Sequence, residues 1–215
     1  MFFDIGRLLG IISGFPLQWL FFKRKTYYED KKIQGRYVRG KALIISNHFN
    51  ALDYVMNSFV LFPRKLNVVA SEFAFRNSFM RFLMKFWGGI EANRITKSPR
   101  FILESAKVLK KGQIVQIFPE GHNTDDGTIK AFYPSYIVIA LKAKAPIVPV
   151  ISDGNYGPFR RAHVIIGKPI NLYDYLRSDK YTREDIENLN KIVRDKVLDL
   201  REELDRRIKN RKGSD

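Results

Sequence analysis

The sequence predicts an α/β fold: a single domain with a mixed, largely buried β-sheet flanked by helices, plus an N-terminal membrane-attaching helical segment. Three observations lead to this fold class. Short β-rich apolar runs alternate along the chain with longer stretches that suit helices. The strand-like runs lack polar alternation, which is typical of a sheet covered on both faces. A chain of 215 residues, 45% hydrophobic and 28% charged, has room for one sizeable core.

The middle of the chain supplies the predicted sheet and its helices. Strands are expected at residues 42–46, 66–70, 113–118, 147–151 and 164–166. Helices are expected at residues 53–62, 78–86, 98–109 and 136–144. In the third of these helices Ser98 is a candidate N-cap before Pro99, and Gly112 supplies a stop after the basic end.

Residues 173–215 predict an amphipathic helix that packs on the domain and ends in a basic tail. Thr182 and Asp185 have the spacing of a capping box. Apolar residues follow at intervals of three or four, at Ile186, Leu189, Val193, Val197, Leu200, Leu204 and Ile208. The polar face carries both signs of charge, which favours a helix that covers the core over one that binds a membrane or partner. The main domain is therefore expected at residues 31–172.

The N-terminal segment, residues 1–30, predicts attachment to a membrane. Residues 8–22 (LLGIISGFPLQWLFF) carry no charge, and a basic run follows at 23–25. These fifteen residues would reach roughly 22 Å as a helix, short of the ~30 Å hydrocarbon core, and Gly14 and Pro16 are expected to interrupt them. Trp19 and the cations suit the headgroup layer. We therefore expect peripheral or monotopic attachment at the cytoplasmic face of a membrane.

Two alternatives apply to the same segment. It could instead be a buried pair of core helices. A cleaved signal peptide is disfavoured, because no small-x-small cleavage site directly follows the apolar run and the basic cluster comes after it rather than before it.

The charge balance narrows the class of partner. The chain has 38 Lys and Arg against 22 Asp and Glu, a formal net charge of +16, which indicates nucleic acid, acidic lipid headgroups, or acidic or phosphorylated substrates. No nucleic acid partner is expected, because the cations are dispersed, no nucleic-acid-binding motif is present and the N-terminus suits a membrane. The chain has no cysteine, which excludes a disulfide framework, an acyl-cysteine intermediate and thiolate metal sites. The three histidines lack metal-ligand spacing, so we expect no metal.

A His and an Asp directly follow the first predicted strand of the domain. In residues 47–53 (NHFNALD), His48 precedes Asp53 by five positions. On one ideal helix the two would lie on different faces, but they can meet if His48 lies in the turn before the helix. A carboxylate at Nδ1 would fix the tautomer and leave Nε2 to act as a general base. The alternative is a polar residue closing a loop and a charge complementing the helix dipole.

Two further segments have the character of binding loops. Residues 118–121 (FPEG) follow another predicted strand; Gly121 would let the backbone approach a ligand, and Glu120 can accept hydrogen bonds from hydroxyls. Residues 88–94 (GGIEANR) end in Arg94, which suits phosphate binding, although a surface cation is the alternative. In α/β folds the ends of strands are where ligands bind. We therefore expect these segments and His48 in one cleft.

These segments, in this order, resemble the 1-acylglycerol-3-phosphate acyltransferase family, also called the lysophosphatidate acyltransferase or PlsC-like group. The family has four blocks, which correspond here to residues 47–53, 89–94, 118–121 and 146–150. The resemblance extends from about residue 41 to residue 170, where residues 166–170 (IGKPI) are similar to the closing strand of the family. It implies the glycerolipid acyltransferase fold.

The resemblance also implies a reaction. A fatty acyl group would move from a thioester donor, acyl-CoA or acyl carrier protein, to the 2-hydroxyl of 1-acylglycerol 3-phosphate, giving phosphatidate. His48 would deprotonate the hydroxyl and Asp53 would orient His48. The donor would be a substrate and no cofactor would be needed. The resemblance implies that the substrate-binding residues are Asn47, Arg94, Glu120 and Gly121, with Arg94 holding the acceptor phosphate.

The sequence departs from the family pattern near the second motif. His122 and Asn123 stand where the family usually has Thr or Ser and then Arg, and Asn50 replaces a Ser. Residues 132–136 (FYPSY) occupy the place of a Lys-Lys-Gly segment. Two alternatives therefore stay open: an acyltransferase acting on a different lysolipid or hydroxyl acceptor, and a noncatalytic membrane lipid-binding protein.

Overall fold

The computed structural model describes residues 2–50, 52–93, 98–124, 127–158, 160–178 and 180–212. Its centre is a seven-stranded sheet in the order β1-β7-β6-β2-β5-β3-β4. The strands are β1 Lys25–Tyr28, β2 Ala42–Ile45, β3 Leu66–Ser71, β4 Gly89–Ala92, β5 Ile114–Ile117, β6 Ile147–Ser152 and β7 His163–Ile166. Only β6 and β7 pair antiparallel among the described strands, and the other neighbours are parallel. The mixed sheet is as predicted.

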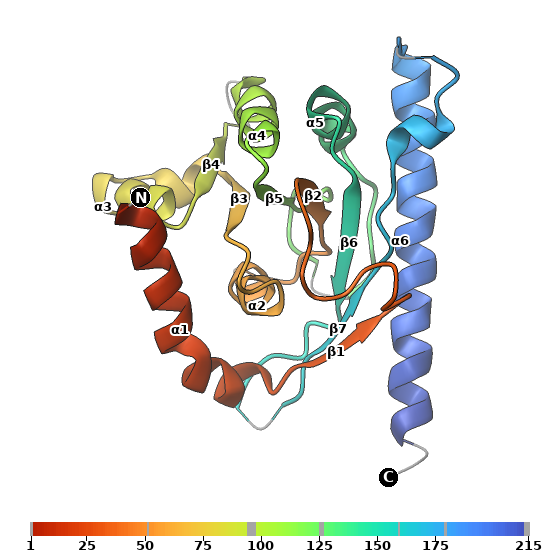
Figure 1. The fold of residues 1–215 in the computed structure, drawn as a ribbon. Helices are drawn as coiled ribbons and strands as arrows, with labels where there is room; N and C mark the ends of the chain where they lie inside the picture. The colour runs from red at the N-terminus through yellow and green to blue at the C-terminus, as the bar shows by residue number, and fades with distance from the viewer. Residues whose placement is uncertain are drawn as a thin grey trace.

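Helices cover both faces of this sheet. They are α1 Phe2–Phe22, α2 Leu52–Val60, α3 Ser78–Phe86, α4 Arg100–Lys110, α5 Ser135–Ala143 and α6 Arg183–Lys212, with short 3₁₀ helices η1 Glu72–Phe75 and η2 Leu172–Tyr175. Figure 1 shows α4 and α5 on one side of the sheet, α1 and α2 on the other, and the long α6 beside β6 and β7.

The pleat of the strands divides the core into two clusters. Along β2, Leu43 and Ile45 pack with α4, α5 and α6, whereas Ala42 and Ile44 point into the cluster formed with α1 and α2. Every residue of β2, β5, β6 and β7 is buried, as the lack of polar alternation predicted. Each fully buried Leu or Ile contributes about 1.5–3 kcal/mol, so these central strands hold the site's scaffold in place.

Most predicted elements appear within two residues of their expected ends, and the differences have local causes. Strands β1 and β4 were not predicted. Helix α4 begins at Arg100 with Pro99 as its N-cap, so the prediction of Ser98 as the N-cap was wrong. The Ser98 Oγ still accepts a hydrogen bond from the Arg100 N–H, at 3.4 Å. The predicted capping box is present, because Thr182 Oγ1 accepts from the Asp185 N–H at 3.2 Å and the Asp185 carboxylate accepts from the Thr182 N–H at 2.7 Å.

Helix α1 corrects one detail of the N-terminal prediction. It runs unbroken through Gly14 and Pro16. Packing overrides the weak helix propensity there, because the Cα of Gly14 lies so close to the Phe59 ring of α2 that a Cβ would come within 2.9 Å of it. The basic run after α1 leads directly into β1, which pairs with β7.

One side of α1 lies on the domain and the other faces outward. Ile11 and Phe22 are buried, and the buried Arg7 donates to the backbone carbonyl of Leu66 at 2.5 Å. Large apolar side chains on the opposite side are exposed, at Ile5, Leu9, Ile12, Trp19, Leu20 and Phe21. Among the described residues, none of the helices combines the length and apolar character needed to cross a membrane.

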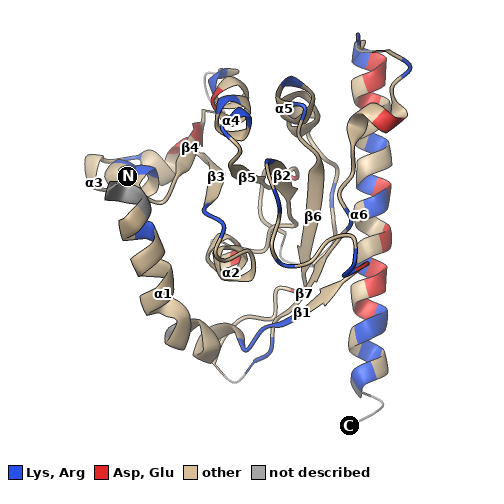
Figure 2. Ribbon diagram, in the orientation of Figure 1, with Lys and Arg blue, Asp and Glu red and all other residues tan. Residues whose placement is uncertain are grey.

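Helix α6 covers the core with one stripe and presents charge on the other. Its inner stripe is buried at Leu189, Val193, Val197, Leu200 and Leu204. Figure 2 shows Lys, Arg, Asp and Glu alternating along its outer side. Both features agree with the prediction of a helix that packs on the domain.

Candidate active site

The turn between β2 and α2 brings His48 and Asp53 together. His48 follows the end of β2, and Asp53 lies in the first turn of α2. Their side chains meet with His48 Nδ1 2.9 Å from Asp53 Oδ2, and Asp53 is only 1% exposed. The predicted contact is confirmed, because His48 precedes the helix rather than belonging to it.

The Asp53 carboxylate accepts several hydrogen bonds besides its contact with His48. Besides His48, its Oδ2 accepts from the backbone N–H groups of Phe49 at 2.7 Å and Asn50 at 2.8 Å. Its Oδ1 accepts from the Tyr156 hydroxyl at 2.5 Å. Burial, followed by the charge of Asp53, raises the pKa of Tyr156, so this hydroxyl stays protonated and donates. These bonds fix the carboxylate that in turn fixes His48.

Tyr156 is a site residue that the sequence reasoning missed. It lies in the connection between β6 and β7, and its ring packs edge-on against Phe22 of α1 with 5.4 Å between ring centroids. Its hydroxyl also shares a hydrogen bond of 2.9 Å with Ser152. No motif marks Tyr156 in the sequence, since it is 103 residues from Asp53.

Asn47 fixes the end of β2 against β6. Its side-chain amide donates to the Ser152 carbonyl at 2.9 Å and accepts from the Ser152 N–H at 3.0 Å. Arg201 of α6 donates to the same carbonyl at 3.2 Å. The observed contacts of Asn47 therefore hold the scaffold of the site, and its contact with substrate stays a prediction.

The second predicted motif lies beside the first. Strand β5 is a parallel neighbour of β2, with Ile117 paired to Ile45, so the segments that follow the two strands begin at the same edge of the sheet. The Phe118 ring stacks on the His48 ring with 3.9 Å between centroids and 16° between planes. Thr124 donates its N–H to the His48 carbonyl at 2.8 Å. The two motifs share one edge of the sheet, as predicted.

Glu120 is fully buried beside His48. Its Oε2 accepts from the Lys130 N–H at 2.9 Å, while its Oε1 has no hydrogen-bond partner among the described residues. Burial raises the pKa of Glu120. The hydrogen bond from the Lys130 N–H opposes that rise, as do the charge of His122 and the nearby backbone N–H of His48, which lies outside hydrogen-bond geometry. An unpartnered acceptor at this position suits a hydroxyl donor from a ligand, although substrate contact stays a prediction.

Gly121 and Arg94 complete the predicted set. Gly121 has φ +72°, and a Cβ there would come within 3.0 Å of the Tyr133 ring, so a side chain would be strained and crowded. Arg94 lies outside the described residues. The other five predicted site residues are thus gathered on one edge of the sheet.

This geometry suits general-base chemistry. With Nδ1 directed at Asp53, the other ring nitrogen of His48 is left to accept a proton, and no hydrogen bond to it forms within the described parts of the chain. The side chain is 19% exposed, so a hydroxyl can reach it. The ring is held from two directions, by Asp53 along its edge and by Phe118 against its face.

Comparison with known proteins assigns the family. Residues 23–153 match the model of the Acyltransferase family. The chain belongs to that family. The matched region contains His48, Asp53, Glu120, Gly121 and strands β1 to β6.

Similar proteins carry one recurrent name. The chain is 26% identical to a 1-acyl-sn-glycerol-3-phosphate acyltransferase of Borreliella burgdorferi over 74% of this chain and 66% of that protein. It is 24% identical to the protein of that name from Cocos nucifera, over 87% of this chain and 61% of the relative. It is 25% identical to the protein of that name from Bacillus subtilis, over 76% of this chain and 82% of that protein. The chain thus spans slightly less than two thirds of the first two relatives.

A solved structure shares the fold of this acyltransferase-family chain. It is the crystal structure of the 1-acyl-sn-glycerophosphate (LPA) acyltransferase PlsC from Thermotoga maritima, with a TM-score of 0.62. The match covers 90% of this chain and 79% of that one, at 19% sequence identity. At this identity the likeness establishes the fold, a sheet flanked by helices.

Proposed function

We propose that this protein is an acyltransferase that moves a fatty acyl group from a thioester donor to the 2-hydroxyl of 1-acylglycerol 3-phosphate, forming phosphatidate. The observation that carries the proposal is the fixed His48–Asp53 pair beside the buried Glu120, in a chain of the Acyltransferase family. The names of the relatives support the choice of acceptor.

In the proposed reaction, His48 Nε2 removes the proton from the acceptor hydroxyl as its oxygen attacks the thioester carbonyl. The imidazolium is stabilised by Asp53, which accepts from Nδ1. The tetrahedral intermediate collapses, the C–S bond breaks, and the proton on His48 passes to the leaving thiolate. A thioester is already activated, so proton removal, positioning and oxyanion stabilisation by backbone N–H groups are sufficient without a metal or cofactor.

The acceptor site is proposed around the second motif. Glu120 Oε1 is a buried acceptor without a hydrogen-bond partner among the described residues, and Gly121 gives the turn its required backbone conformation. Arg94 is proposed to hold the acceptor phosphate, and Asn47 to support the same site through Ser152. The donor is proposed to be acyl-CoA or acyl carrier protein, for which the net charge of +16 offers an attractive surface.

We further propose that the protein attaches to the cytoplasmic face of a membrane, peripherally or monotopically. The support is the outward face of α1, where Ile5, Leu9, Ile12 and Trp19 are 48–65% exposed, together with the uncharged residues 8–22. An exposed apolar stripe followed by cations is typical of segments that lie in the membrane interface.

Acyl transfer by the purified protein in anionic liposomes tests the function. A panel of lysolipid acceptors is offered with acyl-CoA and with acyl carrier protein donors, and ester formation is measured for the wild type and His48→Ala. We expect phosphatidate to form fastest from 1-acylglycerol 3-phosphate and to be lost in the variant. Transfer to another lysolipid alone would correct the acceptor. Folded protein without transfer to any acceptor would favour a noncatalytic lipid-binding protein.

A further inference from the structure

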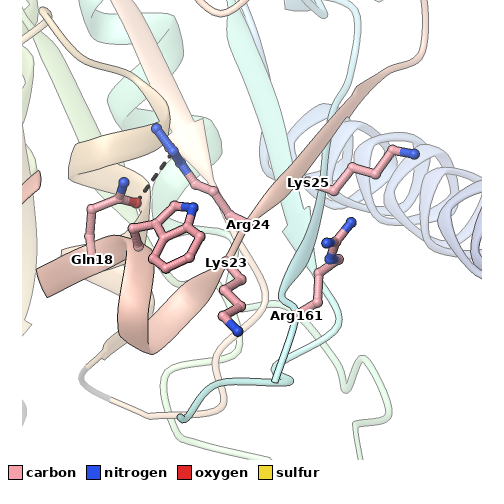
Figure 3. Close-up of a pocket in the computed structure, with 6 residues that line it drawn as sticks. Gln18, Lys23, Arg24, Lys25 and Arg161 are labelled. Carbon is pink, nitrogen blue, oxygen red and sulfur yellow. Dashed lines mark hydrogen bonds between the residues drawn. The ribbon is translucent and has the colours of Figure 1, made fainter. Parts of the chain in front are cut away.

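A basic pocket lies where α1 ends and β1 begins. It has a volume of about 360 Å³ and is lined by Gln18, Trp19, Lys23, Arg24, Lys25 and Arg161. Figure 3 shows these side chains around the junction, four of them Lys or Arg, and no acidic side chain is among the described residues that line it. Its size is within the range of small-molecule sites, and its charge suits an anion.

Hydrogen bonds hold Arg24, one of the cations that line the pocket. Arg24 donates to Gln18 Oε1 at 3.4 Å and to the Phe59 carbonyl at 3.2 Å, which holds the guanidinium in place. Its Nε is buried without a hydrogen-bond partner among the described residues. Burial, followed by the nearby charge of Arg36, lowers the pKa of Arg24, because both disfavour its charged form and negative charge beside the guanidinium would offset them. An anion in the pocket would supply that charge.

The backbone at the pocket adopts an unusual conformation. Lys23 has φ +35°, a left-handed value that is uncommon for a residue other than glycine. Its N–H donates to the Trp19 carbonyl at 3.2 Å, so the strained residue ends the helix there. The turn brings the ammonium of Lys23 over the Trp19 ring, 5.4 Å from its centroid. Cation and indole therefore line one rim of the pocket together.

The surroundings of the pocket point to a lipid. Trp19 is 65% exposed, and the neighbouring Leu20 and Phe21 are 40% and 43% exposed, so apolar surface adjoins the cations directly. A soluble anion needs only the cations, whereas a lipid headgroup presents its phosphate next to its acyl chains. Aromatic rings beside Lys and Arg are typical of protein segments at the headgroup level.

We propose that this basic pocket binds the phosphate of an anionic membrane lipid, with the adjoining face of α1 against the acyl region. The proposal rests on the proposed membrane attachment but not on acyl transfer. One contact connects this end of α1 to the candidate site: Phe22, which precedes the lining residue Lys23, packs on Tyr156, and Tyr156 donates to Asp53. A lipid bound there would set the orientation in which the candidate active site meets the bilayer.

The test is binding of the full chain to vesicles. The double variant Lys23→Gln/Arg161→Gln removes two pocket cations and leaves Arg24, whose hydrogen bonds support the fold. The matched control, Lys107→Gln/Lys110→Gln, removes the same charge from exposed positions on α4. Partition coefficients are measured by co-sedimentation with phosphatidylcholine vesicles and with vesicles that also contain phosphatidylglycerol. Circular dichroism checks that each variant is folded.

The pocket variant should lose roughly twentyfold in partitioning to the phosphatidylglycerol vesicles, about fivefold per cation, and little with phosphatidylcholine alone. The control should lose less than about threefold. Equal losses in both variants would show general attraction and overturn the proposal.

Two further arms separate other sources of phosphate. Inorganic phosphate and glycerol 3-phosphate are added in thermal unfolding experiments. If they stabilise the wild type but not the pocket variant, the pocket binds a soluble phosphate, and the proposal of a lipid ligand is contradicted. Acyl transfer is assayed in detergent micelles; a raised KM for 1-acylglycerol 3-phosphate in the pocket variant would make it the acceptor site instead. Vesicle binding is also measured for His48→Ala, which should bind as the wild type does. The vesicle-binding test can therefore be read even if the protein has no acyltransferase activity.

Discussion

Among the described residues two His–Asp pairs form, and their surroundings differ although both contacts are short. His163 Nδ1 lies 2.7 Å from Asp153 Oδ2, closer than the 2.9 Å between His48 and Asp53. Asp153 also accepts from the backbone N–H of His163 at 3.0 Å, so this pair closes the connection between antiparallel β6 and β7. A short His–Asp contact therefore does not by itself identify a candidate catalytic base.

The surroundings distinguish the two pairs. The Asp53 side chain is 1% exposed, and besides His48 it accepts hydrogen bonds from two backbone N–H groups and from Tyr156. The Asp153 side chain is 12% exposed, and among the described residues its hydrogen bonds come only from His163 and the backbone N–H of Asn155. His48 stands beside the buried Glu120, while His163 lies near the Tyr27 ring at 6.1 Å between centroids. A fixed carboxylate and a neighbouring binding motif make His48 the candidate base.

Replacing Asp53 and Asp153 in turn should change the rate of acyl transfer very differently. Asp53→Asn should lower kcat by roughly 10²- to 10⁴-fold, because the amide can neither hold the required tautomer nor stabilise the imidazolium. Asp153→Asn is the matched control and should keep a rate near that of the wild type. Initial rates of ester formation measure both, and similar losses in the two variants would break the comparison.

Tyr156 distinguishes the two pairs further, because its hydroxyl donates to Asp53, whereas no tyrosine donates to Asp153 among the described residues. Tyr156→Phe should lower kcat roughly tenfold with little change in KM, since it removes one charge-assisted hydrogen bond from Asp53 without touching substrate. Tyr173→Phe, which removes a hydroxyl that donates to the Leu141 carbonyl at 3.2 Å, is the control. If Tyr156→Phe only lowered stability and left kcat intact, its positioning role would be wrong.

The pair at His163 should matter for stability instead. His163→Ala should lower the free energy of unfolding by about 1–3 kcal/mol, because Asp153 loses a partner in a mostly buried turn. Guanidinium chloride denaturation followed by circular dichroism measures the change. An unchanged midpoint would show that this pair does not fasten β6 to β7.

A smaller change is expected in how the stability of the protein depends on pH when Glu120 is replaced. Burial raises the pKa of Glu120 in the folded state, so the unfolded chain releases this proton first as pH increases. The Glu120 contribution to stability is therefore fully present below the unfolded pKa and is lost as pH rises through the folded one. Glu120→Gln should therefore lose less stability than the wild type as pH rises above about 4, the usual pKa range of a Glu side chain. Glu202→Gln, at an exposed position, should follow the wild type, and parallel curves for all three proteins would contradict the prediction.

The candidate site was predictable where its chemistry is local in sequence. His48 and Asp53 are five residues apart across a strand-to-helix turn, so the strand and helix patterns were enough to bring them together. Glu120 could be placed beside them because parallel strands end at one edge. Tyr156 could not, because its contact depends on how the β6–β7 connection folds back over the site, and nothing in its sequence neighbourhood encodes that path.

The fold shows the same division. The central strands were predicted because continuous burial leaves an apolar run. Strand β1 was missed since its four residues are only half-buried and follow an apolar helix, and in β4 only Ile90 is buried. Helix α1 was expected to break at Gly14 and Pro16, yet it is continuous because its inner face packs on α2. Local propensity cannot anticipate such tertiary contacts.

The most direct measurement is acyl transfer to 1-acylglycerol 3-phosphate by two variants in parallel, His48→Ala and His163→Ala, each shown to be folded at the assay temperature. We expect the rate of His48→Ala to fall roughly 10²-fold or more, while His163→Ala keeps most of its rate. Full activity in His48→Ala, or an equal loss in both, would contradict the assignment of His48 as the base.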